Sequence, residues 1–135
     1  MSKRLPQITV MRAYDIGEAD NGYRILVDRL WPRGLTKQEL HVSEWLKELA
    51  PSAELRRWFD HRPERWDAFR KRYASELRTH RDEVDRLVNL AARRRVVLLF
   101  GARDVEYNNA VALREILEAQ RAKKRRPPAH SRVKK

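Results

Sequence analysis

The 135-residue sequence predicts a small layered α/β domain, with a sheet of three strands and helices on both sides of it. Two observations predict this class. Three short runs are largely apolar, as in strands that are buried on both faces of a sheet. The segments between them carry apolar residues at helical spacing. The length suits one hydrophobic core and is too short for two.

The three predicted strands differ in pattern. Ile8–Tyr14 alternates apolar and polar residues, Tyr23–Val27 is largely apolar, and Val96–Phe100 is the most hydrophobic run of the chain. The loop between the first two strands has only about nine residues. A parallel crossover usually needs a dozen or more residues, so a hairpin fits this loop length equally well.

Five helices are predicted. Ser43 is expected to cap a helix that ends at Pro51, and Ser52 to cap a second short helix. Pro63 suits the first turn of a third helix, a fourth begins near Asp82, and the last follows the third strand. Their apolar residues, in order, are Trp45, Leu46 and Leu49; Leu55, Trp58 and Phe59; Trp66, Phe69, Tyr73 and Leu77; Val84, Leu87, Val88 and Ala91; Ala110, Leu113, Ile116 and Leu117.

The charge is concentrated at the C-terminus. Residues 121–135 hold eight basic residues and no acidic one, so they carry +8 of the net charge of +12. We therefore expect one α/β domain at 1–120 and a flexible basic tail at 121–135, because the tail has too few apolar residues to offset its ordering entropy. Such a tail could contact a nucleic acid or the ribosome without sequence specificity. The candidate contacts are Lys123, Lys124, Arg125, Arg126, Arg132, Lys134 and Lys135.

The composition excludes several functional classes. The chain has no cysteine, which excludes disulfides, thiol catalysis, iron–sulfur clusters and the usual structural zinc sites. No stretch approaches the ~18 apolar residues of a transmembrane helix, and the N-terminus lacks the apolar core of a signal peptide. We therefore expect a soluble cytoplasmic protein with no membrane partner. Arg outnumbers Lys by 23 to 8, so arginine is abundant throughout the chain. An arginine therefore indicates phosphate binding only where it occupies a special backbone position.

Polar residues follow the second predicted strand in the segment LVDRLWPRGL. Ligands of open α/β sheets bind beyond the carboxyl ends of the strands, so this segment is a candidate by position. Asp28 closes the strand, and Arg29 and Arg33 follow it. A carboxylate beside two guanidinium groups can orient an arginine toward a phosphate or carboxylate ligand. The alternative is a buried salt bridge between Asp28 and one of these arginines, with Trp31 in the core.

The second candidate segment, LLFGARDVEYNNAVAL, follows the third predicted strand. Gly101 permits close approach of the backbone, Asp104 is a candidate helix cap, and Asn108 and Asn109 fall in the first turn of the last helix. The amides and the dipole of that helix N-terminus favour an anion. The alternative is that one or both asparagines cap the helix or tie the loop together.

His61 is a weaker candidate. It lies just before a helix start and could act as a general acid or base, although a histidine in that position more often serves as a cap. His41, His80 and His130 have no partner at metal-ligand spacing, so we predict no metal site. The four glycines are not clustered, so there is no glycine-rich phosphate loop, and nothing in the sequence indicates a cofactor.

Four ordered motifs make the sequence similar to a known family. These are LVDRLWPRGL, WLKELAPSAELRRWF, HRPERWDAFRKRYASEL and LLFGARDVEYNNAVAL, which resemble the YeaO-like branch of the family called domain of unknown function 488. The resemblance covers about residues 8–117 and leaves out the basic tail. It implies a Rossmann-like fold with parallel strands, in which the first connection is a shortened crossover. It implies no established activity.

The sequence departs from that family at two places. Relatives tend to carry Cys and Glu after the third strand and a Cys–His pair at the following helix. The matching residues here are Phe100, Ala102, Asn108 and Asn109. Chemistry that depends on a thiol, a glutamate or a histidine at those places is therefore not expected of this chain.

Two functional hypotheses follow. The first is a pocket at the carboxyl edge of the sheet, lined by Asp28, Arg33, Asp104 and Asn108, that binds an anionic small molecule such as a phosphate-bearing or nucleotide-like compound. A site of this composition suits an anion and has no obvious nucleophile. The alternative is an accessory protein that contacts RNA, DNA or the ribosome through its tail. The pocket is preferred because the family shares the body and not the tail.

Overall fold

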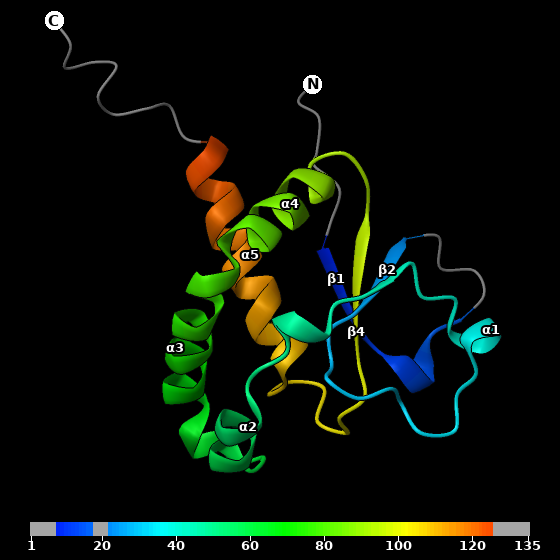
Figure 1. The fold of residues 1–135 in the computed structure, drawn as a ribbon, viewed down its shortest axis with the longest axis horizontal. Coiled ribbons are helices and arrows are strands. Elements are labelled where there is room, and N and C mark those ends of the chain that lie inside the picture. The colour runs from blue at the N-terminus through cyan, green and yellow to red at the C-terminus, as the bar shows by residue number, and fades with distance from the viewer. Residues whose placement is uncertain (1–7, 18–21, 126–135) are drawn as a thin grey trace, which may run out of the picture.

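The computed structural model of the chain describes residues 8–17 and 22–125 (Figure 1). These residues form one sheet of four parallel strands in the order β1-β4-β2-β3. The strands are β1 (Ile8–Arg12), β2 (Tyr23–Leu26), β3 (Glu44–Trp45) and β4 (Val96–Phe100). The predicted α/β class is confirmed, with one short strand more than the three that were expected.

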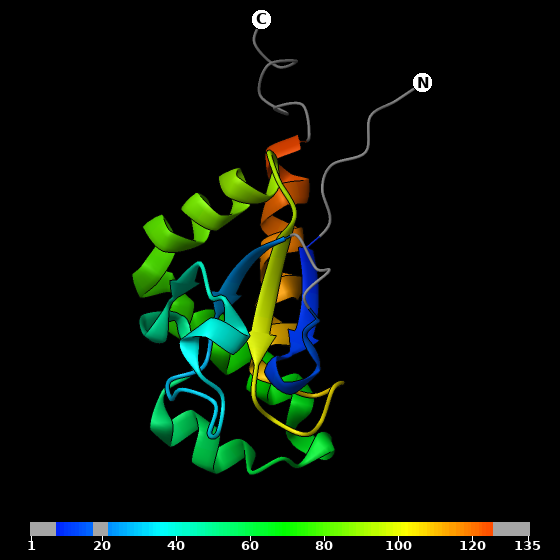
Figure 2. The same cartoon turned by 90° about the vertical axis from the view of Figure 1, so that its right-hand side faces the viewer.

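β4 is a central strand of the sheet. It pairs with β1 on one side and with β2 on the other, and all five of its residues are buried. A strand with neighbours on both edges and cover on both faces must be apolar throughout, which explains its sequence VVLLF. Because β4 lies between β1 and β2 (Figure 2), the first connection is a parallel crossover and not a hairpin.

The helix predicted from Ser43 to Pro51 is wrong. Glu44 and Trp45 instead form β3, which adds to the edge of β2. The backbone N–H of Ser43 donates to the carbonyl of Arg24 (2.7 Å), and the Ser43 hydroxyl accepts from the N–H of Arg24 (3.2 Å). The serine therefore pairs with the sheet edge and does not cap a helix, and only a 3-10 turn, Lys47–Leu49, follows it.

The other predicted helices are present, and one short helix is added. The helices are α1 (Lys37–Leu40), α2 (Ala53–Phe59), α3 (Trp66–Leu77), α4 (Arg81–Ala91) and α5 (Asn109–Arg125). The Ser52 hydroxyl accepts from the N–H of Leu55 (3.0 Å), as expected of a cap for α2. Pro63 begins a 3-10 turn that leads into α3. The unexpected helix, α1, begins at a capping box formed by Thr36 and Glu39.

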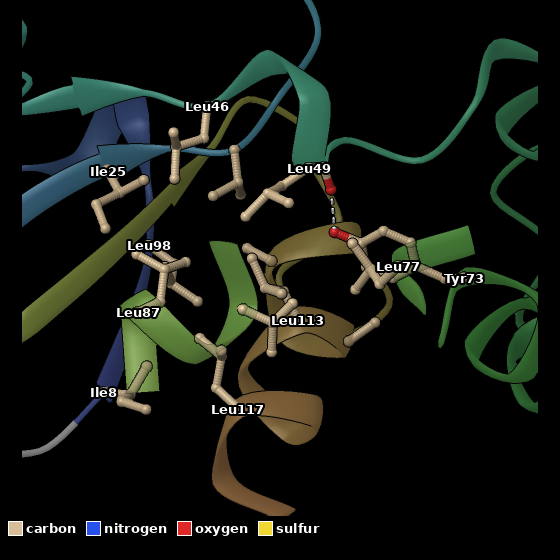
Figure 3. Close-up of a cluster of buried hydrophobic side chains, with 14 of the residues drawn as sticks. Ile8, Ile25, Leu46, Leu49, Tyr73, Leu77, Leu87, Leu98, Leu113 and Leu117 are labelled. Carbon is tan, nitrogen blue, oxygen red and sulfur yellow. Dashed lines mark hydrogen bonds between the residues drawn. The ribbon is translucent and has the colours of Figure 1, made fainter. Parts of the chain in front are cut away.

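The helices are distributed unequally over the two faces of the sheet (Figure 1). α3, α4 and α5 lie on one side, where their apolar residues pack against alternate strand residues such as Ile25 and Leu98. Figure 3 shows this larger core, in which the buried Tyr73 hydroxyl donates to the carbonyl of Leu49 (2.5 Å). The opposite face is covered by α1 and the loop before it, through a smaller cluster that includes Leu40 and Trp31.

α5 continues beyond the predicted boundary of the body. It runs to Arg125, so the first five residues of the predicted tail are helical. Arg121 explains the extension, because its side chain is only 10% exposed and pairs with Glu118 at 2.9 Å. The remaining tail candidates, Arg126, Arg132, Lys134 and Lys135, lie outside the described residues.

Candidate functional site

The carboxyl ends of β2 and β4 lie side by side. The two strands are parallel neighbours, and the N–H of Val27 donates to the carbonyl of Leu99 (3.1 Å) just where they end. The expected meeting of the loops after residues 27 and 100 is therefore confirmed. A cavity of about 480 Å³ lies beyond these strand ends, lined by Asp28, Arg29, Leu30, Pro51, Ala53, Arg56, Arg57, Phe59, Asp60, His61, Phe69, Ala102, Asn108 and Asn109.

Asp28 joins the two strand ends at the cavity. Its Oδ2 accepts from the backbone N–H of Gly101 (2.8 Å), and its Oδ1 accepts from the side-chain amide of Asn109 (3.1 Å). A Cβ atom at residue 101 would lie 3.2 Å from Oδ2, so glycine gives the carboxylate its close approach to the backbone. Burial raises the pKa of Asp28, and the two hydrogen bonds and the nearby Arg56 oppose that rise.

The salt bridge weighed for Asp28 is not formed. Its hydrogen-bond partners are Gly101 and Asn109, and among the described residues it pairs with neither Arg29 nor Arg33. Arg29 instead donates through Nη2 to the carbonyl of Pro51 (3.2 Å), which ties the loop after β2 to the start of α2. Trp31 packs in the smaller core, as that alternative also expected.

Asn108 and Asn109 line the cavity and also hold the backbone. Asn108 directly precedes α5, where its Oδ1 accepts from the N–H of Val111 (2.9 Å), the bond of a helix cap. Asn109 is the first residue of α5, and its amide donates to the carbonyl of Val27 (2.9 Å) as well as to Asp28. Each asparagine therefore has the structural role that was weighed against ligand binding, and both still face the cavity.

Asp104 and Arg33 are not among the residues that line the cavity. The Asp104 carboxylate accepts from the N–H groups of Glu106 (2.9 Å) and Tyr107 (3.1 Å), so it stabilises a turn before α5 and does not cap the helix. The side chain of Arg33 is exposed, and its carbonyl accepts from the Tyr14 hydroxyl (2.8 Å). Of the four residues predicted to line the pocket together, only Asp28 and Asn108 line the cavity.

α2 supplies a wall that the sequence did not predict. Arg56 and Arg57 are exposed side chains of this helix, and both line the cavity together with Arg29. Twenty-three arginines occur in the chain, and these two have the same pattern as any arginine on the solvent side of an amphipathic helix. No local signal distinguishes them, because only the packing of α2 beside the strand ends brings them to the site.

His61 lies on an unusual stretch of backbone at the rim. Asp60 and His61 both have positive φ, 49° and 53°, in the left-handed region that few residues other than glycine adopt. Asp60 ends α2 in this conformation, and its N–H donates to the carbonyl of Arg56 (3.0 Å). His61 is exposed and lines the cavity, so the weaker candidate does lie at the site.

The lining of the cavity combines cations with hydrogen-bonding groups. Three guanidinium groups, two carboxylates, two amides and one imidazole are present, above an apolar part that includes Phe59 and Phe69. The N-terminus of the 17-residue helix α5 is also directed here, and the positive end of its dipole favours an anion. Within residues 8–17 and 22–125, no group of three acidic or histidine side chains could hold a metal ion. His130 lies outside that part of the chain.

The tail candidates that are described lie at the other end of α5. Lys123 and Lys124 are exposed, and Lys124 Nζ donates to Asn89 of α4 (2.9 Å). Arg125 is the last residue of α5. A helix rises about 1.5 Å per residue, so these residues are roughly 20 Å from Asn109. They do not belong to the cavity. No described helix combines the length and apolar character that a membrane crossing requires.

Comparison with known proteins identifies the family. Residues 7–133 match the family model described as the inactive DUF488-N3 subclade. The chain is 42% identical to the uncharacterised protein YeaO of Escherichia coli K12 over 112 residues, which cover 83% of this chain and 97% of that protein. It is 38% identical to the uncharacterised protein Rv3073c of Mycobacterium tuberculosis H37Rv over 117 residues, with coverages of 87% and 98%. No solved structure gives a significant match. The match reaches residue 133, so the prediction that the basic tail lies outside the family is wrong. The resemblance itself is confirmed, and the chain belongs to the domain of unknown function 488 family, within its inactive DUF488-N3 subclade.

Proposed function

We propose that this protein binds a small anionic molecule, phosphate-bearing or nucleotide-like, in the cavity at the carboxyl edge of its sheet. The observation that carries the proposal is the grouping of Arg29, Arg56 and Arg57 around one cavity at neighbouring strand ends. Guanidinium groups recognise phosphate oxygens by paired, charge-assisted hydrogen bonds. The first turn of α5 adds the positive end of a helix dipole.

The hydrogen bonding of Asp28 favours a ligand that carries a hydrogen-bond donor as well as a phosphate. Its oxygens already accept from Gly101 and Asn109, and each carboxylate oxygen has a further acceptor site. A hydroxyl or amino group of the ligand would suit that remaining capacity, whereas a second anionic group would be repelled. A sugar phosphate or a nucleotide combines both kinds of group, with phosphate at the arginines and sugar hydroxyls at Asp28.

The lining supports binding without covalent catalysis. Among the described residues that line the cavity there is no serine, threonine, cysteine or lysine, and the Asp28 carboxylate is already held by hydrogen bonds from Gly101 and Asn109. The subclade is also described as inactive. His61 is the one lining side chain of a type that commonly transfers protons near neutral pH. We therefore place this protein among binding proteins rather than enzymes.

Isothermal titration with ribose 5-phosphate, AMP and inorganic phosphate, at ionic strength held constant with NaCl, tests the proposal. We expect saturable binding that weakens about tenfold or more when Arg56→Gln and Arg57→Gln are combined, because two charge-assisted hydrogen bonds are lost. The matched control combines Arg33→Gln and Arg103→Gln, which remove the same charge from exposed arginines outside the cavity lining. The absence of binding by all three probes, or equal weakening in both variants, would contradict the proposal.

The alternative, nucleic-acid or ribosome contact through the tail, remains a prediction. Four of its seven candidate residues lie outside the described part of the chain. The cavity gives no evidence for or against contact through the tail, because Lys123 and Lys124 lie at the opposite end of α5 from Asn109. The two functions are therefore independent and could coexist in one protein.

A further inference from the structure

A second basic surface lies at the end of the molecule opposite the cavity. α4 ends at Ala91, and Arg93, Arg94 and Arg95 follow in the turn that leads into β4. Figures 1 and 2 show this turn and the last turn of α5 at one end of the molecule, and α2 at the other. We call this basic surface the polar-end surface. It consists of five exposed cations: Arg93, Arg94, Arg95, Lys123 and Lys124.

Side-chain contacts fix the two halves of this surface beside each other. Lys124 Nζ donates to Oδ1 of Asn89 (2.9 Å), one turn before Arg93, and Arg121 Nη1 donates to the carbonyl of Ala91 (3.5 Å). These contacts hold the last turns of α5 against the end of α4. The five cations therefore lie at the same end of the fold.

Four of the five cations of this surface are not neutralised by a carboxylate in the described part of the chain. Among the described residues, Arg93, Arg94, Lys123 and Lys124 form no ion pair with a carboxylate; Arg94 lies over the ring of Tyr23 at 5.0 Å. Arg86 of α4, by contrast, pairs with Glu44 (2.7 Å). Cations near helix C-termini do stabilise the helix dipole, but that effect reaches only the last turn and does not require five of them.

We propose that the polar-end surface binds the phosphate backbone of a double-stranded nucleic acid. Clustered Lys and Arg side chains on a rigid surface release counterions from a duplex and bind it without reading its sequence. The chain also leaves the described structure at this surface, after Arg125, and residues 126–135 add four basic residues and no acidic one. The sequence that follows the surface therefore carries charge of the same sign.

Two other polyanionic partners fit less well. A protein surface that binds lipid is expected to carry an apolar anchor. A surface that binds a single strand is expected to carry aromatic rings on which the bases stack. The exposed large hydrophobic residues of the described chain are Tyr14, Leu30 and Val105. None of them belongs to the polar-end surface, and Tyr23, which does adjoin it, is partly covered by Arg94.

Fluorescence anisotropy with the full-length chain tests this proposal. The probes are a labelled 20-base-pair DNA of arbitrary sequence, the corresponding RNA duplex and the single strand, each titrated at several salt concentrations. The test variant combines Arg93→Gln, Arg94→Gln and Lys123→Gln. The matched control combines Lys71→Gln, Arg78→Gln and Arg81→Gln, three exposed cations of α3, the 3-10 turn that follows it and the start of α4. A third variant, with Arg93→Lys, Arg94→Lys and Lys123→Arg, keeps the charge.

We expect the test variant to bind both duplexes at least about tenfold more weakly at 0.1 M salt. The slope of log affinity against log salt should fall in magnitude by about 2 to 3, roughly one phosphate contact per cation. The control and the charge-keeping variant should bind as the wild type does. An unchanged slope in the test variant, equal losses in test and control, or tighter binding to the single strand than to the duplexes would overturn the proposal. Neutralising Arg56 and Arg57 should leave duplex binding intact, which separates this surface from the cavity.

Discussion

At the scale of single residues, Asp28 determines how the candidate site is held together. Its carboxylate receives one hydrogen bond from the loop after β4 and one from the first residue of α5. It is therefore the point where strand β2, strand β4 and helix α5 meet. Burial penalises its charge, and the hydrogen bonds and Arg56 offset only part of that penalty, so its pKa lies above the ordinary value of 3.8.

Replacement of Asp28 tests both the contacts and the sign of this shift. Asp28→Asn must place an amide against one of two donors, so we expect a loss of about 1–3 kcal/mol of unfolding free energy at neutral pH. Because the pKa is higher in the folded state than in the unfolded state, the contribution of Asp28 is fully present below pH 3.8 and declines as the pH rises through the folded value.

Urea unfolding of both proteins across pH 3 to 7 measures the difference directly. The stability of the wild type relative to Asp28→Asn should be greatest at the acid end and should decrease toward neutral pH, where it levels off. The opposite trend, with the wild-type advantage growing as the pH rises, would mean that hydrogen bonds and Arg56 outweigh burial at this carboxylate.

At the scale of elements, a helix or strand could be predicted where its sequence pattern was long enough to be distinctive. β4 could be predicted because five consecutive buried residues leave an unbroken apolar run. β3 could not, since two residues have no periodicity and their pairing depends on where β2 ends. Ser43 was assigned to a helix because a serine before apolar residues resembles a cap, whereas its backbone is engaged by the sheet edge.

The candidate site was predictable only in part for a related reason. Asp28 and Asn109 were found because strand ends converge in any parallel sheet. Arg33 follows the same strand, yet it lies exposed within the turn that the bond from Trp31 Nε1 to the carbonyl of Leu35 (2.6 Å) spans, and it does not line the cavity. Arg56 and Arg57 reach the cavity through helix packing, which no local pattern encodes.

Ser52 provides a test of how an element is anchored. Its hydroxyl caps α2 and also donates to Glu76 Oε2 of α3 (2.5 Å), so it links the helix that bears Arg56 to the larger core. Ser52→Ala removes both contacts, and we expect a loss of about 1–2 kcal/mol. Thr36→Ala, which removes the cap of the short helix α1, should cost less because the bonds of the Thr36 side chain in the described part of the chain are to Glu39 of α1 itself. Thermal unfolding followed by circular dichroism compares the two, and equal losses would show that the link to Glu76 contributes nothing.

At the scale of the whole molecule, both clusters of apolar residues depend on β4. Val96, Leu98 and Phe100 enter the larger core under α3, α4 and α5, whereas Val97 and Leu99 enter the smaller one under α1. The two functional proposals occupy the two ends of the same strand, with the cavity after Phe100 and the polar-end surface before Val96. β4 therefore lies between the proposed small-molecule site and the proposed polyanion surface, which share no residue.

Hydrogen exchange tests whether β4 is the most stable part of the fold. The amides of β4 that bond to β1 and β2 should exchange slowest, because they open only when both neighbouring strands and both clusters are lost. The amides of β3 and α1 should exchange much faster, since β3 pairs on one edge only and α1 is a single exposed turn. Exchange monitored by NMR at neutral pH resolves these groups. If the slowest amides lie in α4 or α5 while those of β4 exchange with β3, stability resides in the helical layer, and the sheet opens independently of it.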